Sequence, residues 1–135
     1  MSQMEEEDNK DDYPHVELTR DIIGAAMFVL NELRPGLDEK LYENALVIEL
    51  KHRGHKVEQQ NSYPVEFRGE RIGVLIPDIV VDDLVIVDPK VSQAFNESHR
   101  AQMLGYLAIT GLDLALLLNF KYSRLQFKRV IRQEH

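Results

Sequence analysis

The sequence contains no cysteine, which excludes disulfide bonds and thiolate metal sites. It also has no apolar run close to the roughly 20 residues that a membrane-spanning helix needs. A basic stretch followed by an apolar one is missing at the amino terminus, so secretion is not indicated. Together these absences predict a cytoplasmic protein that has no contact with a membrane.

Negative charge dominates the chain, but it is unevenly distributed. The net charge is −7 over 135 residues, and six acidic side chains with a single lysine fall within residues 1–15. Their polar, aperiodic composition predicts a disordered acidic tail over residues 1–15 and one folded domain over residues 16–135. The end of the chain is basic, at Lys121, Arg124, Lys128, Arg129 and Arg132. The net negative charge argues mildly against nucleic-acid binding. The basic edge could still bind nucleic acid, and an ordinary solvated strand explains the edge equally well.

Three segments carry apolar residues at helical spacing. They run from Leu18 to Pro35, from Asp38 to about Arg53, and from Ser92 or Asn96 to Thr110. The side chains expected to cap them are Thr19, Asp38, and either Ser92 or Asn96. Gly54 and Gly111 follow the second and third segments, as glycine commonly does at helix ends.

The remaining segments alternate between apolar and polar residues or are continuously apolar, which is typical of strands. They cover residues 57–60, 65–67, 72–81, 84–89, 114–120 and 125–131, with a bend or bulge at Tyr63-Pro64. Three or four strands therefore precede the third helix. The predicted fold is α/β, with a mixed sheet flanked by helices and the order α-α-β-β-β-α-β-β.

Ionisable side chains interrupt the apolar run of residues 77–90. Asp78 lies in its first arm, and Asp88 and Lys90 lie at the end of its second arm. Burying an unpaired charge is costly, so such residues are usually paired, bound to metal or functional. Asp88 and Lys90 are two residues apart and share one face of a regular strand. Two carboxylates and an ammonium suit a hard divalent cation together with a phosphate.

The loop between the two arms decides whether the aspartates meet. A two-residue turn at Asp82-Asp83 would place Asp78 and Asp88 on opposite faces of the sheet. A three-residue loop or a bulge would pair them, and bulges are common near active sites. Because the metal site requires that pairing, we predict this irregularity.

The second helix carries one continuous stripe of residues at helical spacing, namely Glu39, Tyr42, Glu43, Leu46 and Leu50. Its glutamates lie near the helix amino terminus, where the helix dipole stabilises carboxylates. That is one explanation for them, with Tyr42 packed in the core. The other is that Glu43 or Glu39 reaches the metal as a further ligand.

Two sequence signatures resemble those of known families. Pro77-Asp78 followed by Asp88-x-Lys90 resembles the motif of the PD-(D/E)XK nuclease superfamily. Gly36-x-x-Glu39-x-x-Tyr42 matches the signature that names the GxxExxY protein family, which is assigned to that superfamily. The resemblance runs from about Leu18 to Val130 and includes Pro35, Ala45, Pro64, His99, Gln102, Tyr106, Gly111 and Asn119.

This resemblance implies a restriction-endonuclease-like fold and a metal-dependent nuclease that uses Mg²⁺ or Mn²⁺ on DNA or RNA. The implied metal ligands are Asp78, Asp88, Glu43, Glu39 and the backbone carbonyl of Pro89. The implied catalytic residues are Asp78, Asp88, Lys90, Glu43 and Gln102. The residues expected to contact the substrate are Tyr106, His99 and Tyr42. His99, Gln102 and Tyr106 form one polar stripe on the third helix, and a solvated helix flank would explain that stripe as well.

Some departures from the family pattern keep a second hypothesis open. Asp88 stands where the family usually has Glu, and Pro89 removes a backbone donor between the two functional side chains. Leu30 and Arg34 also replace the usual His and Gly. The alternative is a catalytically inactive module that binds nucleic acid or protein. A homodimer formed through the carboxy-terminal strand is compatible with either hypothesis. The sequence leaves open DNA or RNA, endo- or exonuclease action, and sequence specificity.

Overall fold

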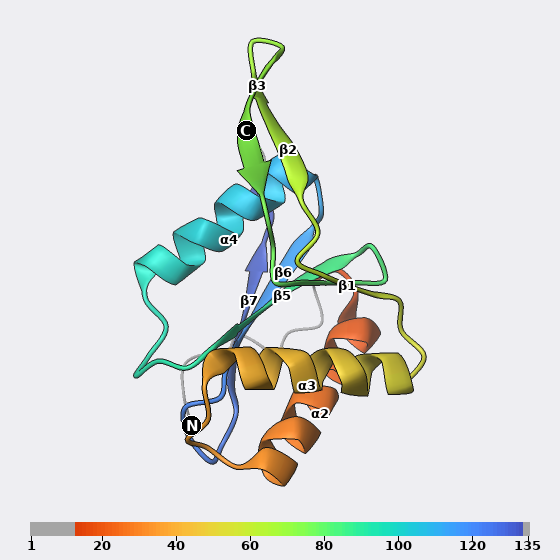
Figure 1. The fold of residues 1–135 in the computed structure, drawn as a ribbon, viewed down its shortest axis with the longest axis vertical. Coiled ribbons are helices and arrows are strands. Elements are labelled where there is room, and N and C mark those ends of the chain that lie inside the picture. The colour runs from red at the N-terminus through yellow and green to blue at the C-terminus, as the bar shows by residue number, and fades with distance from the viewer. Residues whose placement is uncertain (1–12, 134–135) are drawn as a thin grey trace.

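The computed structural model describes residues 13–133 and contains two layers of helices around a mixed sheet (Figure 1). The helices are α2 (Val16–Leu33), α3 (Glu39–His52) and α4 (Glu97–Thr110). The strands are β1 (Val57–Gln59), β2 (Tyr63–Phe67), β3 (Glu70–Leu75), β4 (Ile79–Val81), β5 (Val85–Lys90), β6 (Leu114–Asn119) and β7 (Gln126–Ile131).

Five strands form the main sheet in the order β1-β4-β5-β6-β7. Its neighbouring strands are antiparallel except β5 and β6, which run parallel. A parallel pair needs a crossover connection, and α4 provides it. Among the described strands, β2 and β3 form a separate two-stranded sheet, and their hairpin projects from one end of the molecule (Figure 1). The predicted α/β class with a mixed sheet flanked by helices is confirmed.

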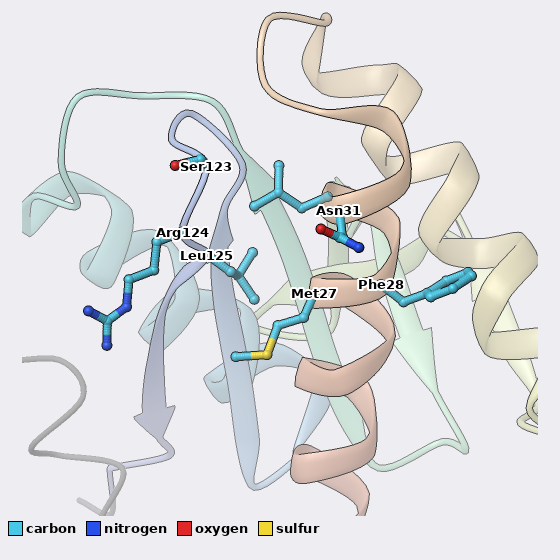
Figure 2. A pocket seen from close by; sticks show the side chains of 7 residues that line it. Met27, Phe28, Asn31, Ser123, Arg124 and Leu125 are labelled. Carbon is cyan, nitrogen blue, oxygen red and sulfur yellow. The ribbon is translucent and has the colours of Figure 1, made fainter.

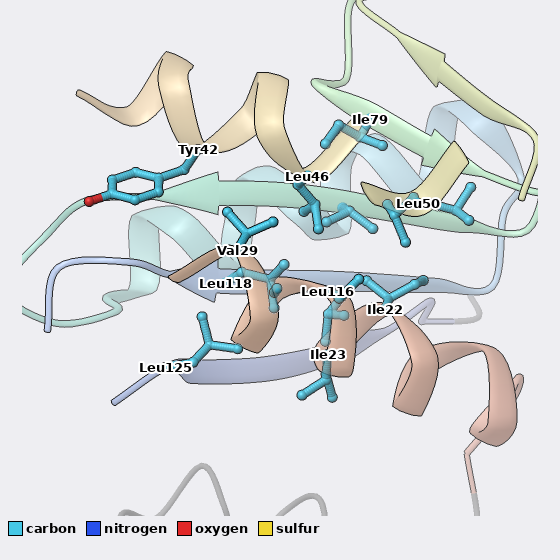
Figure 3. Close-up of a cluster of buried hydrophobic side chains, with 14 of the residues drawn as sticks. Ile22, Ile23, Val29, Tyr42, Leu46, Leu50, Ile79, Leu116, Leu118 and Leu125 are labelled. Atoms are coloured by element: carbon cyan, nitrogen blue, oxygen red, sulfur yellow. The ribbon is translucent and has the colours of Figure 1, made fainter. Parts of the chain in front are cut away.

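The two faces of the sheet have separate cores. Helices α2 and α3 cover one face, where Ile22, Leu46 and Leu50 pack on Ile79 and Leu116 (Figure 3). Helix α4 covers the other face through Met103 and Leu107. Because β6 is buried on both faces, its sequence is continuously apolar rather than alternating. Within residues 13–133, every helix falls short of the length and apolar character needed to cross a membrane.

Five strands separate α3 from α4, not the three of the predicted order. The predicted strand over residues 72–81 is wrong, because the ladder breaks at Ile76-Pro77-Asp78 and leaves β3 and β4 as separate strands. Pro77 has no N–H to donate and restricts the residue before it. The expected bend at Tyr63-Pro64 instead lies inside β2, whose irregularity falls after Val65.

The structure corrects one expected helix cap and decides between the two candidates for another. Thr19 lies inside α2, which begins one turn earlier at Val16, and its hydroxyl donates to the carbonyl oxygen of His15. Asn96 rather than Ser92 caps α4. Asp38 does occupy the N-cap position of α3, although its side chain makes no capping hydrogen bond.

The boundary of the predicted tail is also corrected. Residues 1–12 lie outside the part of the chain that the structure describes. Tyr13 is 8% exposed, and the guanidinium of Arg129 lies 4.0 Å from the centre of its ring. The folded part therefore already includes Tyr13. Its partner lies at the far end of the sequence, so local composition could not indicate this contact.

Candidate active site

The register of the β4–β5 hairpin brings the two aspartates to one face. Val81 lies opposite Val85, so the connecting loop, Asp82 to Leu84, has three residues. Its first two residues have positive φ values of 54° and 57°, which aspartate adopts more readily than most residues. The predicted irregularity is confirmed. Continuing this register by one residue places Asp78 opposite Asp88, where cross-strand neighbours share a face.

That face is the one covered by α4. Side chains alternate along a strand, so Asp78 points the same way as Val80, and Asp88 the same way as Ile86. Val80 and Ile86 pack in the cluster that contains Met103 of α4. Asp88 is 5% exposed, whereas Asp78 is half-buried. Both carboxylates therefore lie at the end of the sheet on the side of α4.

Asp88 is a buried carboxylate with one cationic neighbour. Its Oδ2 lies 3.0 Å from Lys90 Nζ, and among the described residues this ammonium is the one cation that pairs with it. Burial, together with the neighbouring Asp78, raises the pKa of Asp88 to about 7. Burial alone would lower the pKa of Lys90, but the carboxylates of Asp88, Glu39 and Asp78 offset it and the net shift is upward. Lys90 therefore stays charged, and Asp88 would gain from a second cation.

Helix α4 supplies polar groups that hold Lys90. Gln102 Oε1 accepts a hydrogen bond from Lys90 Nζ at 3.4 Å, and Gln102 Nε2 donates to the Tyr106 hydroxyl at 3.1 Å. Burial and the nearby Asp88 raise the pKa of Tyr106, so it remains a neutral phenol. The structure thus brings Gln102 and Tyr106 to the ion pair.

His99 has a structural explanation at the start of the same helix. Its backbone N–H donates to Asn96 Oδ1 at 2.9 Å, and its Nδ1 accepts from the Asn96 backbone N–H at 3.4 Å. These two bonds form a capping box. Burial and the charge of Lys90 lower the pKa of His99, so the ring is neutral near pH 7 and Nδ1 can accept.

Glu43 reaches the site only through another residue. It is 4% exposed, and its Oε2 accepts hydrogen bonds from Lys40 Nζ at 3.0 Å, Gln59 Nε2 at 2.7 Å and Gln60 Nε2 at 3.0 Å. Gln60 Nε2 also donates to Asp78 Oδ1 at 3.2 Å. Gln59 and Gln60 could not be singled out beforehand, because two glutamines at the end of a strand are not a recognisable signal.

The four carboxylates expected to bind the metal do not surround one common point; they are Asp78, Asp88, Glu43 and Glu39. Glu39 is exposed, and its Oε1 accepts from the Val91 backbone N–H at 3.0 Å. In residues 13–133, no three Asp, Glu or His side chains come together as a metal-binding group. Mg²⁺, however, usually binds one or two carboxylates and keeps several waters or substrate phosphates. The buried carboxylate of Asp88, with Asp78 beside it and a single ammonium as counter-charge, fits one such cation.

Pro89 disturbs the sheet less than its missing N–H suggests. The carbonyl of Lys90 accepts from Phe120 N–H at 2.9 Å, so the main-chain groups of Lys90 point toward β6. Main-chain groups alternate along a strand, and those of Pro89 therefore point toward β4. The β4–β5 ladder ends at the Ile79–Val87 pair, so the missing donor falls beyond it. The Pro89 carbonyl is directed to the Asp78 side of the strand.

Tyr42 is fully buried in the core beneath α3. It is 0% exposed; its hydroxyl donates to the Arg34 carbonyl at 2.5 Å and accepts from Leu37 N–H at 3.1 Å. Its ring stacks on Phe120, with ring centres 4.8 Å apart. These bonds hold the loop around Gly36, whose φ of 113° requires glycine. The geometry does not support a contact between Tyr42 and substrate, and it explains the signature tyrosine as a loop clamp.

A hollow of about 440 Å³ lies elsewhere, between α2 and the loop before β7 (Figure 2). It is lined by Met27, Phe28, Leu30, Asn31, Ser123, Arg124 and Leu125. No residue of the candidate site belongs to this lining, so the carboxylates and Lys90 do not face that hollow.

Comparison with known proteins identifies the family. The chain aligns with two solved structures, an alkaline exonuclease (LHK-Exo) from Laribacter hongkongensis and LHK-Exo in complex with dAMP. Each is 14% identical, with 80% of this chain and 76% of the other covered and a TM-score of 0.47, a likeness too slight to carry an argument. No curated protein matches the sequence, and membership of the narrower GxxExxY family stays a prediction. A model of the PD-(D/E)XK nuclease superfamily matches residues 16–130, and the chain belongs to that superfamily.

Proposed function

We propose that the protein hydrolyses phosphodiester bonds of nucleic acid with the help of Mg²⁺ or Mn²⁺. One observation carries the proposal: Asp78 and Asp88 share a face, and among the described residues Lys90 is the one cation that pairs with the buried Asp88. Such an arrangement is unfavourable without an added cation. Membership of the nuclease superfamily agrees with this chemistry.

Asp78 and Asp88 are the proposed metal ligands, and the Pro89 carbonyl is directed to the same side. When bound, the ion polarises a phosphoryl oxygen and lowers the pKa of a bound water. Two carboxylates leave coordination positions for substrate phosphate and water, which is the usual arrangement for Mg²⁺ in phosphate chemistry.

Lys90 is the proposed electrostatic catalyst. Its ammonium is held between Asp88 Oδ2 at 3.0 Å and Gln102 Oε1 at 3.4 Å, so its position is fixed before substrate arrives. A preorganised cation stabilises the negative charge that develops on the phosphate in the transition state. Tyr106 fixes the Gln102 amide by accepting a hydrogen bond from it.

The test is a nuclease assay on single- and double-stranded DNA and on RNA, with Mg²⁺, Mn²⁺ or EDTA. We expect cleavage that needs the metal and that falls by about 100-fold or more in Asp78→Asn and Lys90→Met. The matched control is Asp83→Asn, which makes the same chemical change on the same hairpin. The Asp83 side chain is 60% exposed and pairs with Lys56, so this variant should cleave like the wild type.

Two results would count against the proposal. Equal activity in the wild type, Asp78→Asn and Lys90→Met would indicate a contaminating nuclease or a different site. Absence of cleavage on every substrate with either metal would instead favour a nuclease fold that only binds its partner.

A further inference from the structure

Gln60 connects Glu43 and Asp78, two carboxylates that were each expected to bind the metal directly. Its Nε2 lies 3.0 Å from Glu43 Oε2 and 3.2 Å from Asp78 Oδ1. A glutamine amide nitrogen carries two N–H donors, one for each carboxylate. The backbone N–H of Gln60 also donates to the Asp78 carbonyl at 3.0 Å. Asp78 is therefore held by Gln60 through both its main chain and its side chain.

The backbone of Gln60 is unusual in a way that supports this contact. Its φ is 59°, in the left-handed region that residues other than glycine seldom occupy. Such conformations persist where surrounding interactions fix them, and they concentrate at functional sites. Here the left-handed residue follows directly after β1, and its side chain reaches the residue that precedes β4.

The hydrogen bonds of Glu43 tie one of its two carboxylate oxygens to the Gln60 amide. Its Oε2 accepts from three donors, on Lys40, Gln59 and Gln60, whereas a carboxylate oxygen offers about two lone pairs. That oxygen is already fully used. At Asp78 the same amide takes Oδ1, which leaves the other oxygen to turn toward Asp88.

We propose that Gln60 is a positioning residue that fixes which oxygen of Asp78 faces the metal, and that Glu43 acts on the site through the Gln60 amide. The inference rests on the metal-dependent function proposed above. Metal-binding carboxylates are commonly held by outer hydrogen bonds, and loss of such a partner typically weakens metal binding by about 10- to 100-fold. Glu43 is then the anchor of the amide, and Asp78 is the ligand that the amide orients.

The experiment measures Mn²⁺ affinity of the full chain by isothermal titration calorimetry. Gln60→Asn keeps a residue that tolerates the left-handed backbone, but its amide is one methylene too short to reach both carboxylates. We expect the Kd for Mn²⁺ to rise about 10-fold. The matched control is Gln59→Asn, because Gln59 Nε2 donates to Glu43 Oε2 and Asn44 Oδ1 and not to Asp78. Its Kd should equal that of the wild type.

A second variant separates the two roles considered for Glu43. Glu43→Gln removes the charge but keeps an oxygen that can accept from Gln60. If Glu43 acts through Gln60, the Kd for Mn²⁺ should change little. If Glu43 is a direct ligand, the Kd should rise as much as in Asp78→Asn. Circular dichroism and thermal melting in EDTA establish that each variant is folded before titration.

Each outcome bears on the inference. Wild-type affinity in a folded Gln60→Asn variant overturns it, as does a loss in Glu43→Gln equal to that in Asp78→Asn. Either result leaves the proposed nuclease function in place, because the wild type still binds Mn²⁺. A wild-type protein that binds no Mn²⁺ at millimolar concentration overturns both the inference and the proposed metal dependence.

Discussion

Lys90 Nζ lies 3.0 Å from Asp88 Oδ2, two residues earlier on the same face of β5. The exposed fractions of these side chains are only 17% and 7%, so water can screen neither charge well. Removing one member of a buried pair leaves the other without compensation. Changes at this pair should therefore alter the free energy of unfolding as well as any chemistry at the site.

Lys90→Met should destabilise the metal-free protein at pH 8. The substitution keeps an unbranched apolar chain but removes the only cation paired with Asp88 among the described ion pairs. An uncompensated buried polar or charged group costs about 1–3 kcal/mol, and urea unfolding in EDTA measures this change. The double variant Asp88→Asn/Lys90→Met should recover most of the loss. A double variant as unstable as the single one would mean that the loss comes from packing of the lysine stem.

Asp78→Asn should have the opposite effect on the metal-free protein. Burial and then Asp78 raise the pKa of Asp88, so at pH 8 the folded protein contains two carboxylates that repel each other. Asparagine removes one charge but keeps an oxygen that can accept from Gln60 Nε2. The melting temperature in EDTA should rise, by roughly 3 °C for about 1 kcal/mol of relief.

Calorimetric melting with added Mn²⁺ complements the melting temperature measured in EDTA. The wild type should gain stability from the ion, because a ligand that binds only the folded state stabilises it. Asp78→Asn should gain much less. A variant that melts below the wild type in EDTA would show that Asp78 stabilises the fold by contacts other than its charge.

Residue chemistry and alternation were enough to predict that Asp78, Asp88 and Lys90 lie together. Asp88 and Lys90 share a face because they are two residues apart, and the requirement that Asp78 join them led to the three-residue loop. The contacts of Gln60 could not be predicted from the sequence. They depend on a left-handed backbone at a residue that is not glycine and on side chains from three separate parts of the chain. The break at Pro77 was missed because apolar β-branched residues continue on both sides of it.

Helical periodicity placed Tyr42 correctly on the buried face but could not show where its hydroxyl points. The hydroxyl reaches back to the loop before its own helix. Glu39, from the same signature, accepts from Val91 N–H directly after Lys90. The signature therefore ties the start of α3 to the end of β5, a relationship between distant segments that spacing alone does not encode.

The stability of the protein should also depend on the protonation of His55. Its Nε2 lies 2.5 Å from Asp21 Oδ2 and its Nδ1 lies 2.7 Å from Asp82 Oδ2, so each ring nitrogen faces a carboxylate and the ring is an imidazolium. Burial lowers the pKa of His55, but the hydrogen bonds to Asp21 and Asp82 offset it and the pKa is raised above 6.5. The folded state thus holds this proton more tightly than the unfolded chain.

The sign of the pH dependence follows from that raised pKa. The stabilisation by His55 is complete below the unfolded pKa and is lost as the pH rises through the folded pKa. Urea unfolding of the wild type and of His55→Gln should therefore differ most near about pH 6 and least near about pH 9. Asp88, whose pKa is raised to about 7, also titrates in this range. It is present in both proteins, so its contribution to the free energy of unfolding cancels in the difference. Parallel profiles across the range would mean that His55 is neutral in the folded protein.

Tyr42→Phe tests whether the signature tyrosine is structural. Phenylalanine keeps the ring that stacks on Phe120 but removes the hydroxyl that bonds to the Arg34 carbonyl and the Leu37 N–H. Arg34 and Leu37 are exposed, so water can replace part of these bonds, and the loss should be about 1 kcal/mol, at the lower end of the range for unsatisfied groups. Urea unfolding measures the loss, while the Kd for Mn²⁺ should not change. Unaltered stability combined with weaker binding of Mn²⁺ or nucleic acid would instead indicate that Tyr42 takes part in the functional site.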